Sequence, residues 1–288
     1  MLRKAIESVR EQSVPVEIIV VDDGSDDSTE QMMRLEFPHV RYVRFDGGKG
    51  PSFLRNRGAE IASAPIIFSL DDDAWFATSR TIEQTLTEFS NPRVGAVAIP
   101  FVNVRRGPTV LQSAPDDSDQ YVAHAFVGAA HAVRRDVFLA LGGYRQHLYY
   151  MGEEGDLCLR MLAAGYVTRL GRADSVHHLE STNRVSERAD FYGRQNDILF
   201  VWQNAPSRYL LPHLAGTILL GLRYAVNSAK YPLAMLRGTG SAFLHILRGE
   251  AMREPVALKA YGLYRRLKRS GPLRLKEIEA ELPETLAV

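Results

Sequence analysis

The chain has 288 residues, of which 45% are hydrophobic and 24% charged, and this composition is typical of a globular protein that buries a substantial core. Its single cysteine, Cys158, cannot form an internal disulfide, which excludes a small secreted scaffold held by disulfides and favours a reducing cytosol. Because Cys158 lies between two leucines, we interpret it as a core residue and not as a nucleophile.

The net charge of +1 conceals two regions of opposite sign. Residues 205–272 contain eleven Lys or Arg and two acidic residues, whereas the remainder contains twenty-four bases and thirty-two acids. An acidic region suits a divalent metal, and a basic, apolar region suits an anionic surface such as the inner leaflet of a membrane. We therefore expect the two regions to face different partners.

The first predicted element is a helix over residues 2–12. An α/β domain normally begins with a buried strand that leads into such a helix. We expect that strand to be missing from this polypeptide or to be replaced by another segment.

From residue 16 to about residue 181, short apolar runs rich in β-branched residues alternate with helical stretches, which predicts an α/β fold. The predicted strands cover residues 16–21, 40–45, 66–70 and 94–99. The predicted helices cover residues 25–35, 53–62 and 78–89, and two more end at the glycines 142–143 and 165.

Beyond residue 204 the predicted strands stop and apolar residues recur at helical spacing. The most apolar stretch, residues 209–226, contains Pro212, His213 and Arg223, so it is a poor match to the roughly 20 apolar residues that span a bilayer. We predict two regions: residues 1–204 form an N-terminally truncated catalytic domain, and residues 205–288 form a basic, apolar helical region.

The helical region is expected to lie on an anionic membrane, and the alternative is that its apolar faces pack on the catalytic domain. Its densest basic cluster comprises Arg265, Arg266, Lys268 and Arg269, and this cluster follows the apolar and aromatic residues Leu258, Tyr261, Leu263 and Tyr264.

Three consecutive carboxylates, Asp71, Asp72 and Asp73, follow the strand predicted over residues 66–70. Ligands of open α/β sheets bind at the carboxyl ends of strands, and three adjacent acids repel one another unless a cation neutralises them. Alternation along an extended chain points Asp71 and Asp73 the same way, so this pair can share Mg²⁺ or Mn²⁺ with a diphosphate. The alternative is a solvated acidic turn.

Asp22 and Asp23 leave the strand predicted over residues 16–21. They either accept hydrogen bonds from a nucleotide base or ribose or form an ordinary turn. The glycine-rich residues 47–50 lack the strand-to-helix context of a phosphate loop. Arg55, on the helix that follows, faces either a phosphate or solvent.

Glu153, Glu154 and Asp156 begin a predicted helix, where the helix dipole stabilises acids. A carboxylate there can act as a general base if folding brings it opposite Asp71. His177, which is followed by a second histidine, is a candidate ligand, although paired histidines are more often surface features.

The order of these pieces resembles the family 2 glycosyltransferases, whose catalytic domain has the GT-A fold. The matching segments are residues 17–25 (EIIVVDDGS), Arg55-Asn56-Arg57-Gly58, Leu70-Asp71-Asp72-Asp73, residues 128–134, residues 153–160 (EEGDLCLR) with Gly165-Tyr166, and Val176-His177.

The resemblance implies a role for individual residues. Asp71 and Asp73 would be the two ends of the family's Asp-x-Asp metal motif, with His177, alone or together with His178, at the metal or diphosphate. Glu154 or Glu153 would deprotonate the acceptor hydroxyl, and Asp156 belongs to the same segment. The implied nucleotide-sugar contacts are Asp22, Asp23, Arg55, Asn56, Asp71 and Asp72.

The function that the resemblance implies is transfer of a sugar from a nucleoside diphosphate donor to a hydroxyl of a glycan or lipid-linked acceptor, with inversion and with Mn²⁺ or Mg²⁺. The expected setting is cell-surface polysaccharide or glycolipid synthesis, in the cytoplasm or peripherally on the inner face of the plasma membrane, with no nucleic-acid partner. The alternatives are a sugar nucleotidyltransferase and an inactive, membrane-associated binding subunit; Glu154 in place of the family's Asp suggests the latter.

Overall fold

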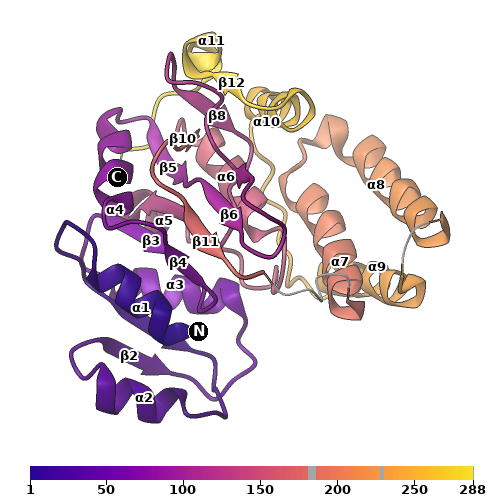
Figure 1. Cartoon of the computed structure of the whole chain (residues 1–288). Coiled ribbons are helices and arrows are strands. Elements are labelled where there is room, and N and C mark those ends of the chain that lie inside the picture. Colours follow the sequence, from indigo (N-terminus) through magenta and orange to yellow (C-terminus); the bar gives the residue numbers. More distant parts are fainter. Residues whose placement is uncertain (181–185, 228–229, 288) are drawn as a thin grey trace.

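The computed structural model of the chain describes residues 1–180, 186–227 and 230–287 (Figure 1). Its largest sheet has six strands in the order β12-β8-β10-β5-β9-β3. These strands are β3 (Ile66–Ser69), β5 (Val94–Ala98), β8 (Tyr121–Ala123), β9 (His131–Arg134), β10 (Val167–Leu170) and β12 (Leu273–Arg274). β5 and β10 pair in parallel, and the other neighbours are antiparallel.

The two central strands are buried along their whole length, because helices or loops cover both faces of the sheet there. A strand buried on both faces needs a continuous apolar run, which is what residues 94–99 supply. α6 (Glu153–Ala163) packs on β10, and α10 (Leu258–Ser270) packs on α6. The other helices around the sheet are α3 (Pro51–Ile61), α4 (Thr81–Thr87), η1 (Glu88–Ser90), α5 (Arg135–Ala140), α11 (Leu275–Ile278) and η2 (Glu279–Glu281).

A second sheet of four strands brings two distant segments of the chain to the site. Its order is β4-β11-β6-β7, formed by β4 (Ala74–Phe76), β6 (Phe101–Asn103), β7 (Val110–Leu111) and β11 (Val176–His178). β11 runs antiparallel to β4, with His178 opposite Ala74. This register places the end of β11 beside the acidic turn that precedes β4.

The N-terminal part forms a small separate layer. α1 (Leu2–Arg10) packs against β4, while β1 (Ile19–Asp22) and β2 (Arg41–Arg44) form a parallel pair next to α2 (Thr29–Glu36). Among the described residues no strand joins this pair to the six-stranded sheet. α3, which packs on both β1 and α5, connects the two layers instead.

The predicted fold class is confirmed: the sheets are flanked by helices, and a helical region follows them. The four predicted strands are present, shifted at their ends by up to three residues. The expectation that strands stop after residue 204 is wrong at β12, which returns to pair with β8. Cys158 is buried, and burial raises the pKa of its thiol to about 12, which fits the core role predicted for it.

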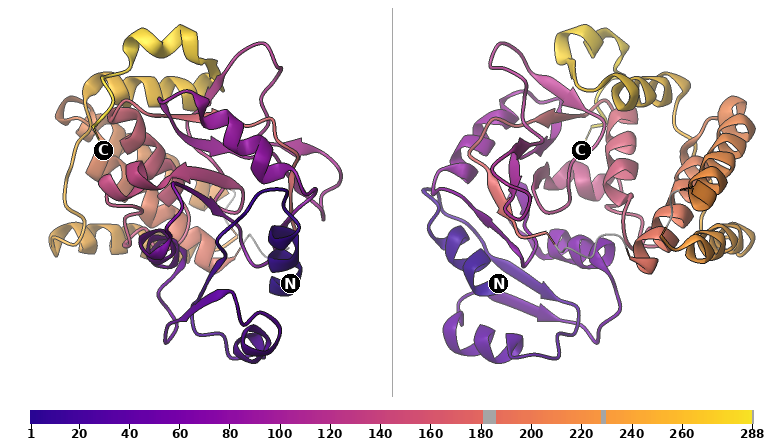
Figure 2. Two further views of the ribbon diagram at one scale, coloured as in Figure 1. Left: turned by 90° about the vertical axis from the view of Figure 1, so that its left-hand side faces the viewer. Right: turned by 45° about the vertical axis from the view of Figure 1, so that its right-hand side comes forward.

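Three helices form a lobe beside the sheets, as Figure 1 and the right-hand view of Figure 2 show. They are α7 (Glu187–Asn204), α8 (Ser207–Asn227) and α9 (Pro232–Leu247). Their inner faces share a buried apolar cluster that contains Ile198, Leu199 and Ala242 and extends to Leu148 of the main body. In the described part of the chain, α8 alone is long and apolar enough to cross a membrane.

The apolar face of α10 is packed against the main body. Tyr261, Leu263, Tyr264 and Leu267 are buried in the main core, whereas Leu258 at the start of the helix and most of its basic residues are exposed. For α10, the alternative given above is therefore the better description: its apolar face packs on the catalytic domain and its basic side chains are solvated.

Replacing a core leucine of α6 should reveal how much this packing contributes. Leu159 is fully buried between the main sheet and α10, so Leu159→Ala should lower the free energy of unfolding by about 2 to 5 kcal/mol. Leu211→Ala, at a residue of α8 that is 74% exposed, should change it by less than about 0.5 kcal/mol. Urea titration of both variants measures the difference, and equal losses would contradict the packing described.

Candidate active site

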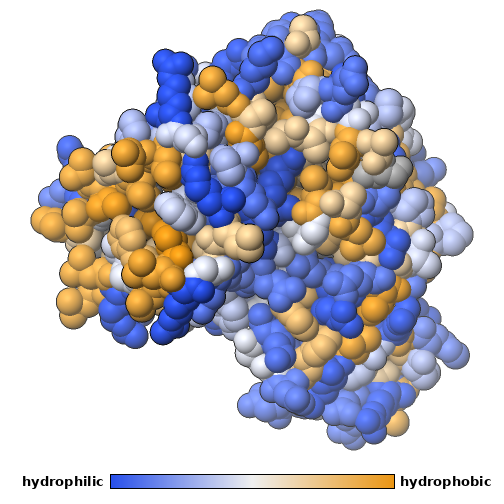
Figure 3. Space-filling view, turned by 180° about the vertical axis from the view of Figure 1, so that it is seen from behind, coloured by the Kyte–Doolittle hydropathy of each residue, from blue (hydrophilic) through white to orange (hydrophobic). Residues whose placement is uncertain are grey.

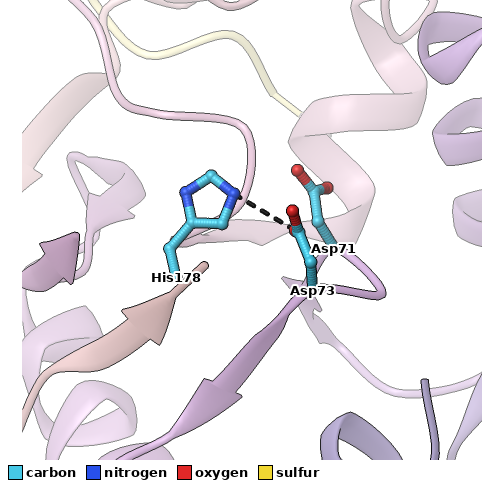
Figure 4. Close-up of side chains that lie close together, drawn as sticks. All are labelled: Asp71, Asp73 and His178. Carbon is cyan, nitrogen blue, oxygen red and sulfur yellow. Dashed lines mark ion pairs between the residues drawn. The ribbon is translucent and has the colours of Figure 1, made fainter. Parts of the chain in front are cut away.

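Two carboxylates and an imidazole converge where β3 ends and β4 begins (Figure 4). Each of Asp71, Asp73 and His178 offers a ligand atom, and these atoms all lie within 4.8 Å of one another. His178 Nε2 is 3.2 Å from Asp73 Oδ1, whereas its buried Nδ1 atom has no hydrogen-bond partner in the described residues. Two carboxylate oxygens and a histidine nitrogen suit a divalent cation such as Mn²⁺.

The position of His177 corrects one prediction. Successive side chains of a strand point to opposite faces, so the imidazoles of His177 and His178 diverge. His177 contacts the edge of Trp75, with ring centroids 5.7 Å apart. Burial and the neighbouring Lys4 lower the pKa of His177. The histidine beside the acidic pair is therefore His178 and not His177.

Arg55 of α3 joins the acidic turn to the start of α6. Its Nη2 atom donates to Asp71 Oδ1 at 2.9 Å, and Nη1 donates to Glu153 Oε1 at 3.2 Å. Burial opposes the charge of Arg55, but Asp71 and the nearby acids outweigh it and raise the pKa of the guanidinium. His131 lies close by, and burial together with Arg55 lowers the pKa of that imidazole to about 3, so it is neutral.

Glu153 and Glu154 differ in their surroundings although they are adjacent. Glu153 is buried, and its Oε2 atom has no hydrogen-bond partner in the described part of the chain. Burial and the charge of Glu154 raise the pKa of Glu153 to about 8, against the opposing effect of Arg55. Glu154 is only half-buried, so it is the member of the pair that an external hydroxyl group can reach.

Gly128 leaves room for this arrangement. A Cβ atom at that position would lie 2.7 Å from Arg55 Nη2 and 2.8 Å from Glu154 Oε1, closer than non-bonded atoms tolerate. The segment 128–134 matched the family pattern, but the sequence alone did not show what its glycine is for.

The turn before α6 is strained and is held from outside. Met151 has φ +71° and Gly152 has φ +89°, and the left-handed region is costly for a residue with a side chain. Asn196 of α7 donates hydrogen bonds to the carbonyl oxygens of Tyr150 at 3.0 Å and of Met151 at 2.6 Å. The helical lobe thus fixes the turn that presents Glu153 and Glu154, a role that we did not predict for Asn196.

Asp156 lies outside the site, contrary to the prediction. It is fully buried, and it accepts hydrogen bonds from Arg145 at 2.7 Å and from Arg160 and Asn204 at 2.8 Å each. A carboxylate enclosed by three donors cannot reach an acceptor hydroxyl group. Its position supports a structural role, which links α6 to α7.

Asn56 is likewise occupied by the protein. Its amide donates to the carbonyl oxygen of Tyr144 and accepts from the amide of Tyr144, both at 2.8 Å. The side chain is buried. It therefore does not face a nucleotide sugar, contrary to the prediction.

The acids after β1 also have different environments. Asp22 is buried and accepts from Ser25 and from the hydroxyl of Tyr42; burial opposes ionisation, but these hydrogen bonds outweigh it and lower the pKa of Asp22. Asp23 is half-buried, and its carboxylate accepts the backbone amides of Lys49 and Gly50 at 2.9 and 3.0 Å. Of the two, Asp23 is the more accessible to a ligand.

Asp72 is not one of the clustered residues, and it is exposed. Partial burial and the charges of Asp73 and Asp71 raise its pKa, as expected for three adjacent acids.

Comparison with solved structures shows that the arrangement of the sheets and helices is that of GT-A glycosyltransferases. The mannosyltransferase PcManGT from Pyrobaculum calidifontis, in complex with GDP-Man and Mn²⁺, superimposes with a TM-score of 0.56 at 19% identity, over 94% of this chain and 83% of that one. GalNAc-T7, with UDP, GalNAc and Mn²⁺, gives a TM-score of 0.60 at 15% identity, over 89% of this chain and 56% of that one. At these identities the similarity establishes the fold.

The sequence matches agree with the fold. The model of the family "Glycosyl transferase family 2" matches residues 1–142. The O-antigen chain rhamnosyltransferase WbaN of Salmonella anatum is 26% identical over 188 residues, which cover 59% of this chain and 58% of that protein. The pre-mycofactocin glycosyltransferase of Mycobacterium tuberculosis is 28% identical over 219 residues, covering 67% of this chain and 43% of that protein.

The family model matches 142 of the 288 residues, and the relatives and the fold agree with it in supporting a glycosyltransferase of family 2. It spans about half the length of the curated relatives that it matches.

The buried proton of Glu153 should leave a signature in stability. The folded protein keeps that proton up to about pH 8, whereas an unfolded glutamate releases it near pH 4.5. Between these values the folded state binds more protons than the unfolded state, so this group makes stability fall as pH rises. The stability of Glu153→Gln relative to the native protein should therefore rise progressively between pH 5 and pH 8. Denaturant titrations across this range measure the effect, and a pH-independent difference would contradict the raised pKa.

Proposed function

We propose that the chain transfers a sugar from a nucleoside diphosphate donor to a hydroxyl group of a glycan or lipid-linked acceptor, with inversion at the anomeric carbon. One observation carries the proposal: Arg55 joins the acidic pair at Asp71 to the glutamates that begin α6. A diphosphate site and a base within reach of the transferred sugar are the two components that this reaction needs.

The diphosphate end would be held at Asp71, Asp73 and His178. These three donor atoms suit Mn²⁺ or Mg²⁺ in number and chemistry. A divalent cation bound there would offset the negative charge of the departing diphosphate. Asp23, beside the loop that Lys49 and Gly50 form, would contact the base or ribose of the donor.

Glu154 would act as the general base for the acceptor. Its half-exposed carboxylate takes the proton of the acceptor hydroxyl group while the hydroxyl oxygen forms a bond to the anomeric carbon. The bond between that carbon and the diphosphate breaks, and the nucleoside diphosphate leaves with the electron pair. A single displacement of this kind inverts the anomeric centre. Glu153, protonated near neutral pH because of its raised pKa, and Arg55 would position Glu154 rather than take the proton.

The acceptor class rests on the relatives and on the charge of the C-terminal region. WbaN is named an O-antigen chain rhamnosyltransferase, and another relative is the succinoglycan biosynthesis protein ExoU of Rhizobium meliloti. A role in cell-surface polysaccharide or glycolipid synthesis would bring the enzyme to lipid-linked acceptors on the inner face of the plasma membrane. The basic residues of the segment 205–272 suit that location.

The nucleotidyltransferase alternative is less well supported. It would need a glycine-rich phosphate loop after its first strand, but residues 47–50 follow β2, and Asp23 already accepts the amides of Lys49 and Gly50. The inactive-subunit alternative makes a different prediction, namely that no nucleoside diphosphate is released from any donor.

Removing the acidic pair should abolish donor binding that depends on Mn²⁺. Asp71→Asn and Asp73→Asn each remove one of the charges that would hold the cation, so transfer should be lost and the double variant should bind nucleoside diphosphates equally with and without Mn²⁺. Asp72→Asn, at an exposed residue outside the cluster, is the matched control and should retain most binding. Calorimetry with UDP and GDP measures this, and unchanged Mn²⁺-dependent binding in the double variant would remove the metal site from the proposal.

Replacing the proposed general base, Glu154, should lower the turnover rate without changing the affinity for the donor. A base acts in the transition state and adds little to ground-state binding, so Glu154→Gln should lower the rate of nucleoside diphosphate release by roughly 100-fold or more with nearly unchanged donor affinity. If Glu154→Gln instead weakens donor binding to the same degree, Glu154 belongs to the donor pocket.

A further inference from the structure

The outward faces of α8 and α9 are apolar, and none of the residues that the structure describes covers them. On α8, Leu211, Ala215, Leu219, Leu222 and Val226 are all exposed, and their spacing of three or four residues places them on one stripe. On α9, Leu233, Leu236, Leu244 and Leu247 form a similar exposed stripe. Figure 3 shows apolar side chains gathered over this lobe, in contrast to the mixed surface of the main body.

These stripes are additional to the faces that hold the lobe together. Leu214 and Ile218 of α8 and Ala242 and Ile246 of α9 already pack on the cluster around α7. Only 11% of the apolar window of α8 is buried, and Val226 and Leu247 are 84% and 81% exposed. Contiguous apolar surface of this extent on a soluble domain indicates a contact with a partner or a membrane.

The positive charge around the stripes indicates what kind of surface binds there. Residues 205–249 contain no acidic residue and five basic ones: Arg208, Arg223, Lys230, Arg237 and Arg248. The two acids further along the region are both paired, Glu250 with His245 and Glu254 with Arg145. Exposed Tyr224 and Phe243 add the aromatic side chains that favour the boundary between headgroups and acyl chains.

We propose that the outward faces of α8 and α9 form a docking surface for an anionic lipid bilayer, with the leucine stripes entering the boundary of the acyl chains and the bases contacting the headgroups. The docking surface is defined by the two leucine stripes together with Arg223 and Arg248. It differs from the basic cluster of α10, whose neighbours Tyr261, Leu263 and Tyr264 are buried in the main core.

Two other occupants fit these observations less well. A second copy of the chain, bound through the same surface, would bring Arg223, Lys230 and Arg248 against like charges. A bilayer-spanning α8 would have to leave contacts on its inner side, where His213 is 3.1 Å from the hydroxyl of Tyr261 and Gly221 packs on the guanidinium of Arg194. Lying in the membrane interface preserves these contacts and covers the exposed stripes.

Flotation of the full chain with vesicles tests the proposal. Binding to phosphatidylcholine vesicles with 30% phosphatidylglycerol should exceed binding to pure phosphatidylcholine by at least tenfold and should weaken in high salt, because each base near an anionic surface adds to affinity. Leu211→Ser, Leu219→Ser, Leu244→Ser and Leu247→Ser combined should abolish binding to either vesicle. These side chains are exposed, so unchanged thermal unfolding and unchanged donor turnover in solution would show that the variant is folded and that its loss is independent of the proposed chemistry.

A matched charge pair supplies the control. Arg223→Gln with Arg248→Gln should weaken binding to anionic vesicles by roughly tenfold or more. Arg34→Gln with Arg80→Gln, which removes the same charge from exposed positions on the main body, should leave it nearly unchanged. Equal losses for the two pairs, or equal binding to neutral and anionic vesicles, would overturn the proposal.

Two further outcomes would also contradict it. Resistance of the bound protein to extraction by alkaline carbonate would indicate a spanning helix instead. A dimer in solution that dissociates when the four leucines are replaced by serine would indicate a second copy of the chain.

Discussion

The hydrogen bonds of Arg55 to Asp71 and Glu153 are the constraint on which the rest of the site depends. They join three segments: the helix after β2, the acidic turn after β3 and, about one hundred residues after Arg55 along the chain, the start of α6. A guanidinium that is largely buried needs partners to offset its desolvation; Asp71 supplies the opposite charge and Glu153 accepts a hydrogen bond. Its two partners are in turn held at a fixed separation, and this sets the distance between the acidic pair and the glutamates.

Several other features of the fold support that contact. Gly128 leaves space beside the guanidinium, Asn196 holds the strained turn before Glu153, and the buried ion pairs of Asp156 anchor α6 to its neighbours. These contacts hold the charged groups of the candidate site in place, as catalysis by positioned charges requires. Because Asn196 lies on α7, the lobe that carries the proposed membrane surface also supports the candidate catalytic helix.

Much of the fold and the acidic pair could be predicted from the sequence, because an apolar β-branched run followed by acids marks the carboxyl end of a strand. The choice between His177 and His178 could not, since it depends on the register between β11 and β4, which are about one hundred residues apart. Asp156 and Asn56 match the family pattern, but their burial depends on partners from α7 and from the turn at Tyr144. Likewise α8 and α10 both appear amphipathic and basic, and only tertiary contacts show that α10 is packed while the outer side of α8 is exposed.

The most direct test of the account is the position of Mn²⁺ in crystals of the full chain grown with Mn²⁺ and a nucleoside diphosphate. Anomalous scattering should show a single cation about 2.1 to 2.3 Å from carboxylate oxygens of Asp71 and Asp73 and from Nε2 of His178. The electron density should also show that Arg55 keeps its hydrogen bonds to Asp71 and Glu153. A cation bound elsewhere, or one that leaves His178 without contact, would contradict the site described for this protein.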